Sequence, residues 1–295
     1  METNYIEALM EEVDANVKEL VDIFKFLLKY NVLFRGSGIE FAGLREYVAG
    51  EDDATKIDWK ASLRSNKLYV KQYEDERNLD IFIMVDTSAS MVFGTQSKLK
   101  SEYAATVAGS IAYACIESGD NVGFAMFSDS VKISLPPSGD ITQYYIILKN
   151  LVDPRFYGGP CNFEAAMSHV LNSITDKTAL FIISDFIGIG TGWKNSFKAV
   201  CGKLDGVFGI MVRDIVDSEL PEGVGTMRFS DPFTEDKVMT VNLDRAKKDF
   251  DREAALQELN IEREFTNSGA GLVRVHTNEP FTKPLVKYLQ TLQSF

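Results

Sequence analysis

Short apolar runs alternate with longer stretches of helical periodicity over most of the chain. From residue 79 onward, the runs LDIFIMVD, NVGFAMFSD, ALFIISD, GVFGIMVRD and GLVRV predict buried strands at 79–86, 121–129, 179–185, 206–214 and 271–275. Helices are predicted between and after them, at 98–118, 141–152, 163–174, 193–204, 244–266 and 281–293. Strands without polar alternation, separated by helices, indicate an α/β fold, a doubly wound and mostly parallel sheet with helices on both faces.

Two further segments are predicted to be hairpins. VKISL at 131–135 follows the strand at 121–129 too closely for a crossover helix, so we expect an antiparallel edge strand there. TMRFSD and KVMTVNL, within 226–243, form a second pair of short strands before the long helix at 244–266.

The chain before residue 79 has a different pattern. Apolar residues, including Ile6, Met10 and Val13, recur every three or four positions through the first thirty-odd residues. This spacing predicts an amphipathic helix that packs on the core, with a partner-binding helix as the alternative. The following glycine-rich and acidic segment predicts short strands and turns. We therefore divide the chain into an N-terminal helix (1–35), a small β-containing segment (36–78) and a main domain (79–295).

Charge and composition narrow the range of partners. The 295 residues carry 31 Lys+Arg against 43 Asp+Glu, a formal net charge of −12. This acidic balance argues against binding to nucleic acid or to anionic lipid, because neither phosphates nor headgroups would be neutralised. No apolar run is long enough for membrane insertion, the N-terminus is acidic, and the three cysteines form no CxxC pair. A cytoplasmic protein is expected.

The candidate functional residues lie where the predicted strands end. Asp86 ends one strand and Asp185 another, at the carboxyl edge where open α/β sheets bind ligands. Ser88 and Ser90 follow Asp86 in a D-x-S-x-S loop before a helix. Carboxylate and hydroxyl oxygens suit a hard divalent cation, so we predict one Mg²⁺ or Mn²⁺ ion at this edge.

Simpler interpretations exist for the same residues. A strand-terminal Asp is often a helix N-cap, and Ser88 and Ser90 could cap the helix that follows.

Other residues near the predicted strand ends have structural interpretations. Asp129 is expected in a hairpin turn, and Asp214 is expected to cap a helix or to pair with Arg213. The run GIGTGW at 188–193 imitates a dinucleotide loop, but tryptophan replaces the last glycine, which favours a loop beside the metal site.

The loop and its later aspartate resemble the von Willebrand factor A domain with its metal-ion-dependent adhesion site. The resemblance implies Rossmann-like topology and assigns Asp86, Ser88, Ser90 and Asp185 as metal ligands. In that family a further loop supplies a threonine, and here GGPCNFEAAM at 158–167 places Cys161 at its position. A thiol is a poor ligand for Mg²⁺, so Cys161 is either a ligand or a spectator, with Asn162 or water in its place.

A second resemblance extends upstream. GIEFAGLREY at 38–47, the acidic pair Asp52-Asp53 and IDWKAS at 57–62 resemble the signature of the DUF 58 family, and LPEG at 220–223 and FSDP at 229–232 fit its later part. Proteins of this family join that signature to a von Willebrand A-like domain. The resemblance implies an adaptor or assembly factor that works with a MoxR-type AAA+ ATPase.

These observations favour a non-enzymatic interaction module in which a partner protein supplies a carboxylate to the bound cation. A Mg²⁺-dependent phosphatase or phosphotransfer enzyme at the same edge is one alternative, although Ser88 stands where Asp-nucleophile phosphatases place their general acid. A scaffold whose site binds no metal is another. Neither histidine lies near a GxSxG serine, so nucleophilic catalysis finds little support.

Overall fold

The structure is a computed structural model, and it describes residues 7–11, 13, 40–48, 57–65, 67–74, 80–231 and 234–292. Contacts divide the chain into two units, one of Met1–Phe34 with Leu79–Phe295 and one of Arg35–Asn78. Of the predicted N-terminal helix, residues 7–11 and 13 are helical, and Leu9 and Val13 are buried in the core of the larger unit. The rest of that predicted helix lies outside the described residues.

The smaller unit contains a two-stranded antiparallel sheet and a helix. Strand β1 (Glu40–Glu46) pairs with β2 (Tyr69–Glu74), and helix α2 (Trp59–Ser65) lies between them in the chain. The sequence pattern predicts only strands and turns here. The helix begins because the carboxylate of Asp58 accepts hydrogen bonds from the first backbone amides, those of Lys60 and Ala61.

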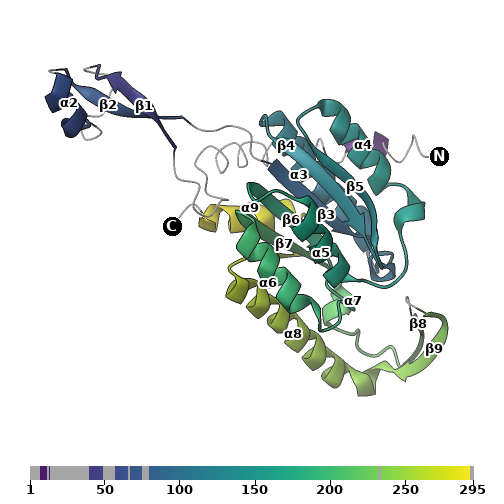
Figure 1. Cartoon of the computed structure of the whole chain (residues 1–295). Helices are drawn as coiled ribbons and strands as arrows, with labels where there is room; N and C mark the ends of the chain where they lie inside the picture. The colour runs from purple at the N-terminus through teal and green to yellow at the C-terminus, as the bar shows by residue number, and fades with distance from the viewer. Residues whose placement is uncertain are drawn as a thin grey trace. The chain divides into compact units, whose positions relative to one another are not determined.

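The larger unit is built on a six-stranded sheet in the order β10-β7-β6-β3-β4-β5 (Figure 1). All neighbours are parallel except β4 and β5, so the predictions of a mostly parallel sheet and an antiparallel edge strand are confirmed. Its strands are β3 (Asp80–Asp86), β4 (Asn121–Phe127), β5 (Val131–Ser138), β6 (Thr178–Ser184), β7 (Gly206–Arg213) and β10 (Gly271–His276).

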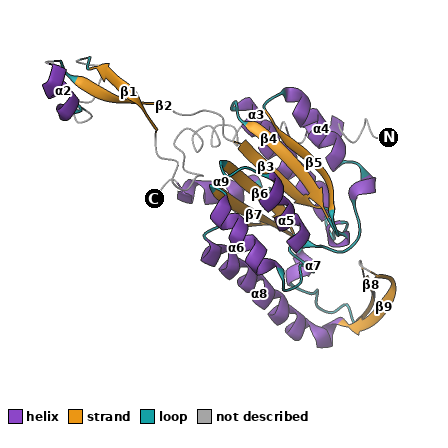
Figure 2. Cartoon of the chain, viewed as in Figure 1, coloured by secondary structure: helices purple, strands orange, loops and turns teal. Residues whose placement is uncertain are grey.

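Helices cover both faces of this sheet, as Figure 2 shows, and divide the core into two clusters. Alternate residues of β3 enter different clusters: Ile81 and Ile83 face one side, and Phe82 and Met84 face the other. Both faces are buried, which explains the continuous apolar runs of the sequence. One cluster is closed by α3 (Lys100–Glu117), α4 (Ile141–Leu151) and α9 (Thr282–Leu292), the other by α5 (Phe163–Ser173), α6 (Trp193–Lys203) and α8 (Leu243–Ser268).

The remaining elements connect these layers. The predicted second hairpin is present as β8 (Thr226–Asp231) and β9 (Thr234–Asn242). Among the described residues of the larger unit, three short helices were not predicted: η2 (Ala89–Met91), η3 (Pro154–Phe156) and α7 (Ile215–Ser218). Within the part of the chain that the structure describes, no helix combines the length and the apolar character needed to cross a bilayer.

The sheet topology explains why the candidate site lies at the carboxyl ends of β3 and β6. Along the chain, β3 is followed by β4 on one side, whereas β6 and then β7 are added on the other side of β3. The strand order therefore reverses between the carboxyl ends of β3 and β6. Open α/β sheets bind ligands at such a reversal, because the loops of the two strands diverge there.

Candidate metal centre

Two aspartates lie at this reversal point. Asp86 is the last residue of β3, and Asp185 directly follows β6, its neighbour in the sheet. Both are fully buried. The structure thus brings together the two carboxylates that the sequence predicts to share a site.

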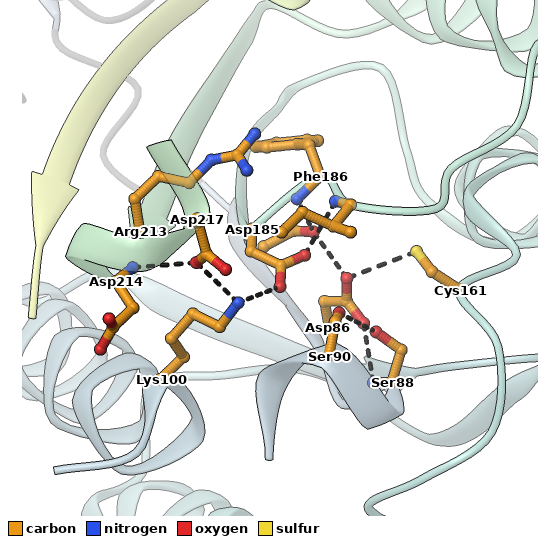
Figure 3. Close-up of polar contacts among 12 residues, drawn as sticks. Asp86, Ser88, Ser90, Lys100, Cys161, Asp185, Phe186, Arg213, Asp214 and Asp217 are labelled. Atoms are coloured by element: carbon orange, nitrogen blue, oxygen red, sulfur yellow. Dashed lines mark hydrogen bonds and ion pairs between the residues drawn. The ribbon is translucent and has the colours of Figure 1, made fainter. Parts of the chain in front are cut away.

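Three uncharged groups donate hydrogen bonds to the Asp86 carboxylate. The backbone N–H of Ser88 donates to Oδ1 at 2.8 Å, while the Ser184 hydroxyl and the Cys161 thiol donate to Oδ2 at 2.6 and 3.4 Å (Figure 3). Ser184 also accepts a hydrogen bond from the backbone N–H of Phe186, at 2.8 Å. These contacts hold the carboxylate in one orientation without supplying a formal positive charge.

The electrostatic consequence is a carboxylate whose ionised form is disfavoured. Burial, followed by the negative charge of Asp185, raises the pKa of Asp86 to about 6. None of the ion pairs found among the described residues includes Asp86. A cation beside this carboxylate would replace the hydration that the folded protein removes.

The two serines of the loop place their hydroxyls together. Helix η2 turns the chain so that the Oγ atoms of Ser88 and Ser90 lie 3.1 Å apart, both on buried side chains. The Ser88 side chain makes no capping hydrogen bond to η2, and the longer helix α3 begins only at Lys100, with Leu99 at its N-cap position. The alternative in which these serines cap the following helix is therefore wrong.

A lysine that the sequence analysis did not single out neutralises Asp185. The Nζ atom of Lys100 lies 2.7 Å from Asp185 Oδ2 and 2.8 Å from Asp217 Oδ2 (Figure 3). Only 1% of the Lys100 side chain is exposed. The other oxygen of Asp185 accepts a hydrogen bond from the N–H of Ile187, at 2.8 Å. Both oxygens of Asp185 are thus engaged by the protein.

Asp214 has a structural role, as expected. It caps α7 by accepting from the N–H of Val216, and it also accepts from the N–H and hydroxyl of Thr95 and from the hydroxyl of Thr277. Burial raises the pKa of Asp214, but these hydrogen bonds outweigh burial and the net shift is downward. The alternative pairing with Arg213 is not observed among the described contacts.

The buried Arg213 interacts instead with helix α8. It donates to the side-chain oxygen of Gln257 at 2.8 Å and lies 3.9 Å from Glu258. Gln257 in turn donates to the carbonyl of Phe186, at 2.8 Å. This chain of contacts supports the loop that follows Asp185, where Phe186 adopts a left-handed conformation with φ of 53°.

Cys161, and not Asn162, contacts the candidate ligands. Asn162 caps α5 by accepting from the N–H of Ala165, and its amide donates to the carbonyl of Asp129. The Cys161 thiol, 6% exposed, points to Asp86. Burial, followed by the charge of Asp86, raises the pKa of this thiol. In the absence of a cation, Cys161 is therefore a neutral hydrogen-bond donor.

The side chains at this site offer the oxygen atoms that divalent cations prefer, but they include too few charged groups to hold a cation by themselves. Asp86, Ser88 and Ser90 present oxygen atoms from buried side chains at one loop. No group of three or more His, Cys, Asp or Glu side chains among the described residues could hold a metal ion by itself. A cation here would depend on hydroxyl oxygens, water and an external ligand to complete its coordination.

Two other predicted features lie outside this contact network. Asp129 is in the β4–β5 turn, where its carboxylate is bonded to Lys132 and Ser130, in keeping with the predicted structural role. The glycine-rich loop at 188–192 lines a cavity of about 320 Å³ against α8. Lys194, which also lines the cavity, is paired with Glu264.

Comparison with known proteins identifies relatives over most of the chain. The family model described as "Protein of unknown function DUF58" matches residues 43–260. The uncharacterized protein Rv1480 of Mycobacterium tuberculosis is 26% identical over 260 residues, which cover 87% of this chain and 80% of that protein.

Two solved structures match this chain at low sequence identity. The conserved hypothetical protein BatB from Bacteroides thetaiotaomicron is 17% identical with a TM-score of 0.48, covering 74% of this chain and 100% of that structure. An aerotolerance-related membrane protein from Bacteroides fragilis is 16% identical with a TM-score of 0.46, covering 72% and 100%.

Proposed function

This chain belongs to the DUF58 family, and we propose that it is a non-enzymatic module that binds a partner protein through a divalent cation. The observation that supports this proposal is the environment of Asp86. It is a fully buried carboxylate at the reversal point of the sheet, beside two buried hydroxyls and outside the described ion pairs. An arrangement of this kind disfavours the empty site more than the occupied one, because it buries negative charge without a counter-charge.

The residues have distinct roles in this proposal. Asp86, Ser88 and Ser90 are the direct oxygen ligands of a Mg²⁺ or Mn²⁺ ion, as in the von Willebrand A-like site that their spacing resembles. Asp185, which Lys100 neutralises and holds in position, is not a direct ligand in this proposal. Water and a carboxylate from the partner fill the remaining positions. The cation thus supplies local positive charge on a protein whose formal net charge is −12.

The proposed partner follows from the family resemblance. A MoxR-type AAA+ ATPase, or a client of one, would present an acidic side chain to the cation, and this chain would act as an adaptor or assembly factor. Complex formation would then require the metal as well as the two proteins.

The test measures metal binding first and partner binding second. Metal-free protein should gain thermal stability when Mg²⁺ or Mn²⁺ is added, and Asp86→Ala should abolish that gain. Asp129→Ala is the matched control, since it removes a carboxylate from a turn that is not part of the contact network. Binding of a purified MoxR-type ATPase should require the cation and be lost in Asp86→Ala. Wild-type protein that gains no stability with either ion would contradict the proposal.

One observation favours a second candidate, a scaffold that binds no metal. Lys100 already places an ammonium group between Asp185 and Asp217, so part of the site has an internal cation. Metal analysis of the purified protein and partner binding in the presence of EDTA distinguish the two candidates. Turnover of a phosphate ester that is lost in Asp86→Ala would instead indicate the phosphotransfer alternative.

A further inference from the structure

The ammonium group of Lys100 lies next to the candidate cation site. Asp86 and Asp185 are at the carboxyl ends of neighbouring strands, and their negative charges interact. Figure 3 shows Asp185 between Asp86 and Lys100, whose Nζ atom lies 2.7 Å from Asp185 Oδ2. The carboxylate of Asp185 is therefore within reach of two positive charges, the ammonium and any cation bound at Asp86.

The fold holds Lys100 in this position. Its backbone N–H donates to the carbonyl of Phe93 at 2.9 Å, which fixes the start of α3. Its Nζ atom also lies 2.8 Å from Asp217 Oδ2, an oxygen that accepts the N–H of Asp214 as well. Because only 1% of the Lys100 side chain is exposed, water does not replace Asp185 as the partner of the ammonium.

The pairing with Lys100 removes Asp185 from the ligand set of a cation. One of its oxygens contacts the ammonium, and the other accepts a hydrogen bond from a backbone N–H. A divalent cation at the same carboxylate would meet the positive charge of Lys100 at short range, where burial prevents screening by water and salt. In the free chain, the cation would therefore be held by one carboxylate, that of Asp86, with the hydroxyls of Ser88 and Ser90 and water.

We propose that Lys100 sets the affinity of this site for its cation. By neutralising Asp185, it leaves the free chain with a weak site that becomes tight when a partner's carboxylate completes the coordination. This inference rests on the proposed function. Mg²⁺ in proteins is usually bound through one or two carboxylates together with water, and the partner supplies the second carboxylate that Lys100 withholds. Because linkage is reciprocal, the partner strengthens cation binding by the same factor as the cation strengthens partner binding.

Two double variants of the full chain test this role of Lys100. Each removes the ammonium and one carboxylate, so both keep the net charge of the wild type. Lys100→Met with Asp217→Asn frees Asp185 for a cation, whereas Lys100→Met with Asp185→Asn is the matched control that does not.

Calorimetric titration of metal-stripped protein with Mg²⁺ and with Mn²⁺ measures the affinity. It should rise at least about tenfold over wild type in the first variant, the equivalent of about 1.4 kcal/mol, and should not rise in the control. Equal affinities in the two double variants would overturn the inference.

A single substitution tests the same inference without removing the buried ammonium. Asp185→Asn leaves Lys100 paired with Asp217, so this variant keeps one ion pair of the cluster. Its cation affinity should stay within about tenfold of wild type, whereas Asp86→Asn should lose binding. A loss in Asp185→Asn as complete as in Asp86→Asn would show that Asp185 is a ligand despite Lys100, which would overturn the inference.

The results distinguish this inference from the proposed function. Wild-type binding that depends on Asp86, with no gain when Asp185 is freed, would overturn the inference and leave the proposed function intact. Binding that occurs only in Lys100→Met with Asp217→Asn would support the inference and contradict the proposed function, which requires the wild-type chain to bind. Absence of binding by Mg²⁺ and Mn²⁺ in wild type and in both double variants would overturn both.

Discussion

The Lys100 ammonium lies 2.7 Å from the Asp185 carboxylate, and at most 1% of either side chain is exposed. The same ammonium lies 2.8 Å from Asp217, whose carboxylate also accepts the N–H of Asp214. Helix α3, the loop after β6 and the start of α7 therefore meet at one buried cation. Because two carboxylates share this single ammonium, its removal should affect stability more than a surface ion pair would.

Substitution of Lys100 tests this relationship. Lys100→Met should lower the free energy of unfolding by about 3–5 kcal/mol, because it leaves Asp185 and Asp217 buried without a cation. Urea denaturation followed by circular dichroism measures the change. Adding Asp185→Asn and Asp217→Asn to Lys100→Met should recover most of the loss.

A matched surface control is available. Lys132 pairs with Asp129 in the β4–β5 turn, where 30% and 51% of the two side chains are exposed. Lys132→Met should cost less than about 1 kcal/mol. Equal losses in Lys100→Met and Lys132→Met would show that the buried ammonium does not stabilise the fold.

The raised pKa of Asp86 predicts a specific dependence of stability on pH. The folded-state pKa is about 6 against an ordinary value of 3.8, so the folded protein binds the additional proton between these values. Without metal, this contribution to stability is fully present below about pH 4 and is lost as the pH rises through about 6. Asp120, raised to about 6 by burial, contributes in the same direction.

Urea denaturation in EDTA across this pH range isolates the contribution of Asp86. The fall in unfolding free energy between about pH 4 and about pH 6 should be smaller in Asp86→Asn than in wild type, and Asp120→Asn should reduce it separately. An Asp86→Asn protein with the same pH dependence as wild type would show that Asp86 ionises normally in the folded state.

Ser184 positions Asp86, and its removal should be costly. Its hydroxyl donates to Asp86 and accepts from the buried N–H of Phe186, so Ser184→Ala leaves two buried polar groups each short of one partner. The free energy of unfolding should fall by about 1–3 kcal/mol. The exposed Ser130, whose hydroxyl bonds only to Asp129 among the described contacts, is the control. A loss in Ser184→Ala no larger than in Ser130→Ala would contradict this role.

A pair of glycine substitutions tests the packing of α8 on the sheet. A Cβ at Gly209 in β7 would lie 2.5 Å from the ring of Phe265, whereas a Cβ at Gly202 in α6 meets no atom within 4 Å. Gly209→Ala should therefore destabilise the protein by about 1–3 kcal/mol through overpacking. Gly202→Ala should stabilise it by about 0.5–1 kcal/mol, because alanine favours the helix. Melting temperatures that shift in the same direction would contradict this account.

Most of the large-unit fold follows from local patterning in the sequence. Buried strands such as 79–86 and 179–185 are continuous apolar runs because both faces of the sheet are covered, and the helices between them show their own period. The short turn before residue 131 allows only an antiparallel partner. These features depend on residues close in the chain, so the sequence alone suffices to predict them.

Part of the candidate site was also accessible from the sequence. Asp86 and Asp185 were predicted to meet because parallel strands share one carboxyl edge. Ser184 was missed because a serine within a buried strand gives no signal of its partner. Lys100 was missed because a lysine in the first turn of a helix is ordinarily a solvated residue.

The sequence by itself thus determined the strands and the long helices of the larger unit and the loop that carries Asp86, Ser88 and Ser90, since spacing along the chain sets them. Only the tertiary structure decided which charge neutralises which carboxylate. Lys100 is 85 positions from Asp185 and 117 from Asp217, and Cys161 is 75 from Asp86. Pairing over such distances in the chain is set by how helices and loops pack at the edge of the sheet. Burial there makes each unpaired charge unfavourable, so each carboxylate is stabilised by whichever hydrogen-bond donor or cation the packing brings beside it.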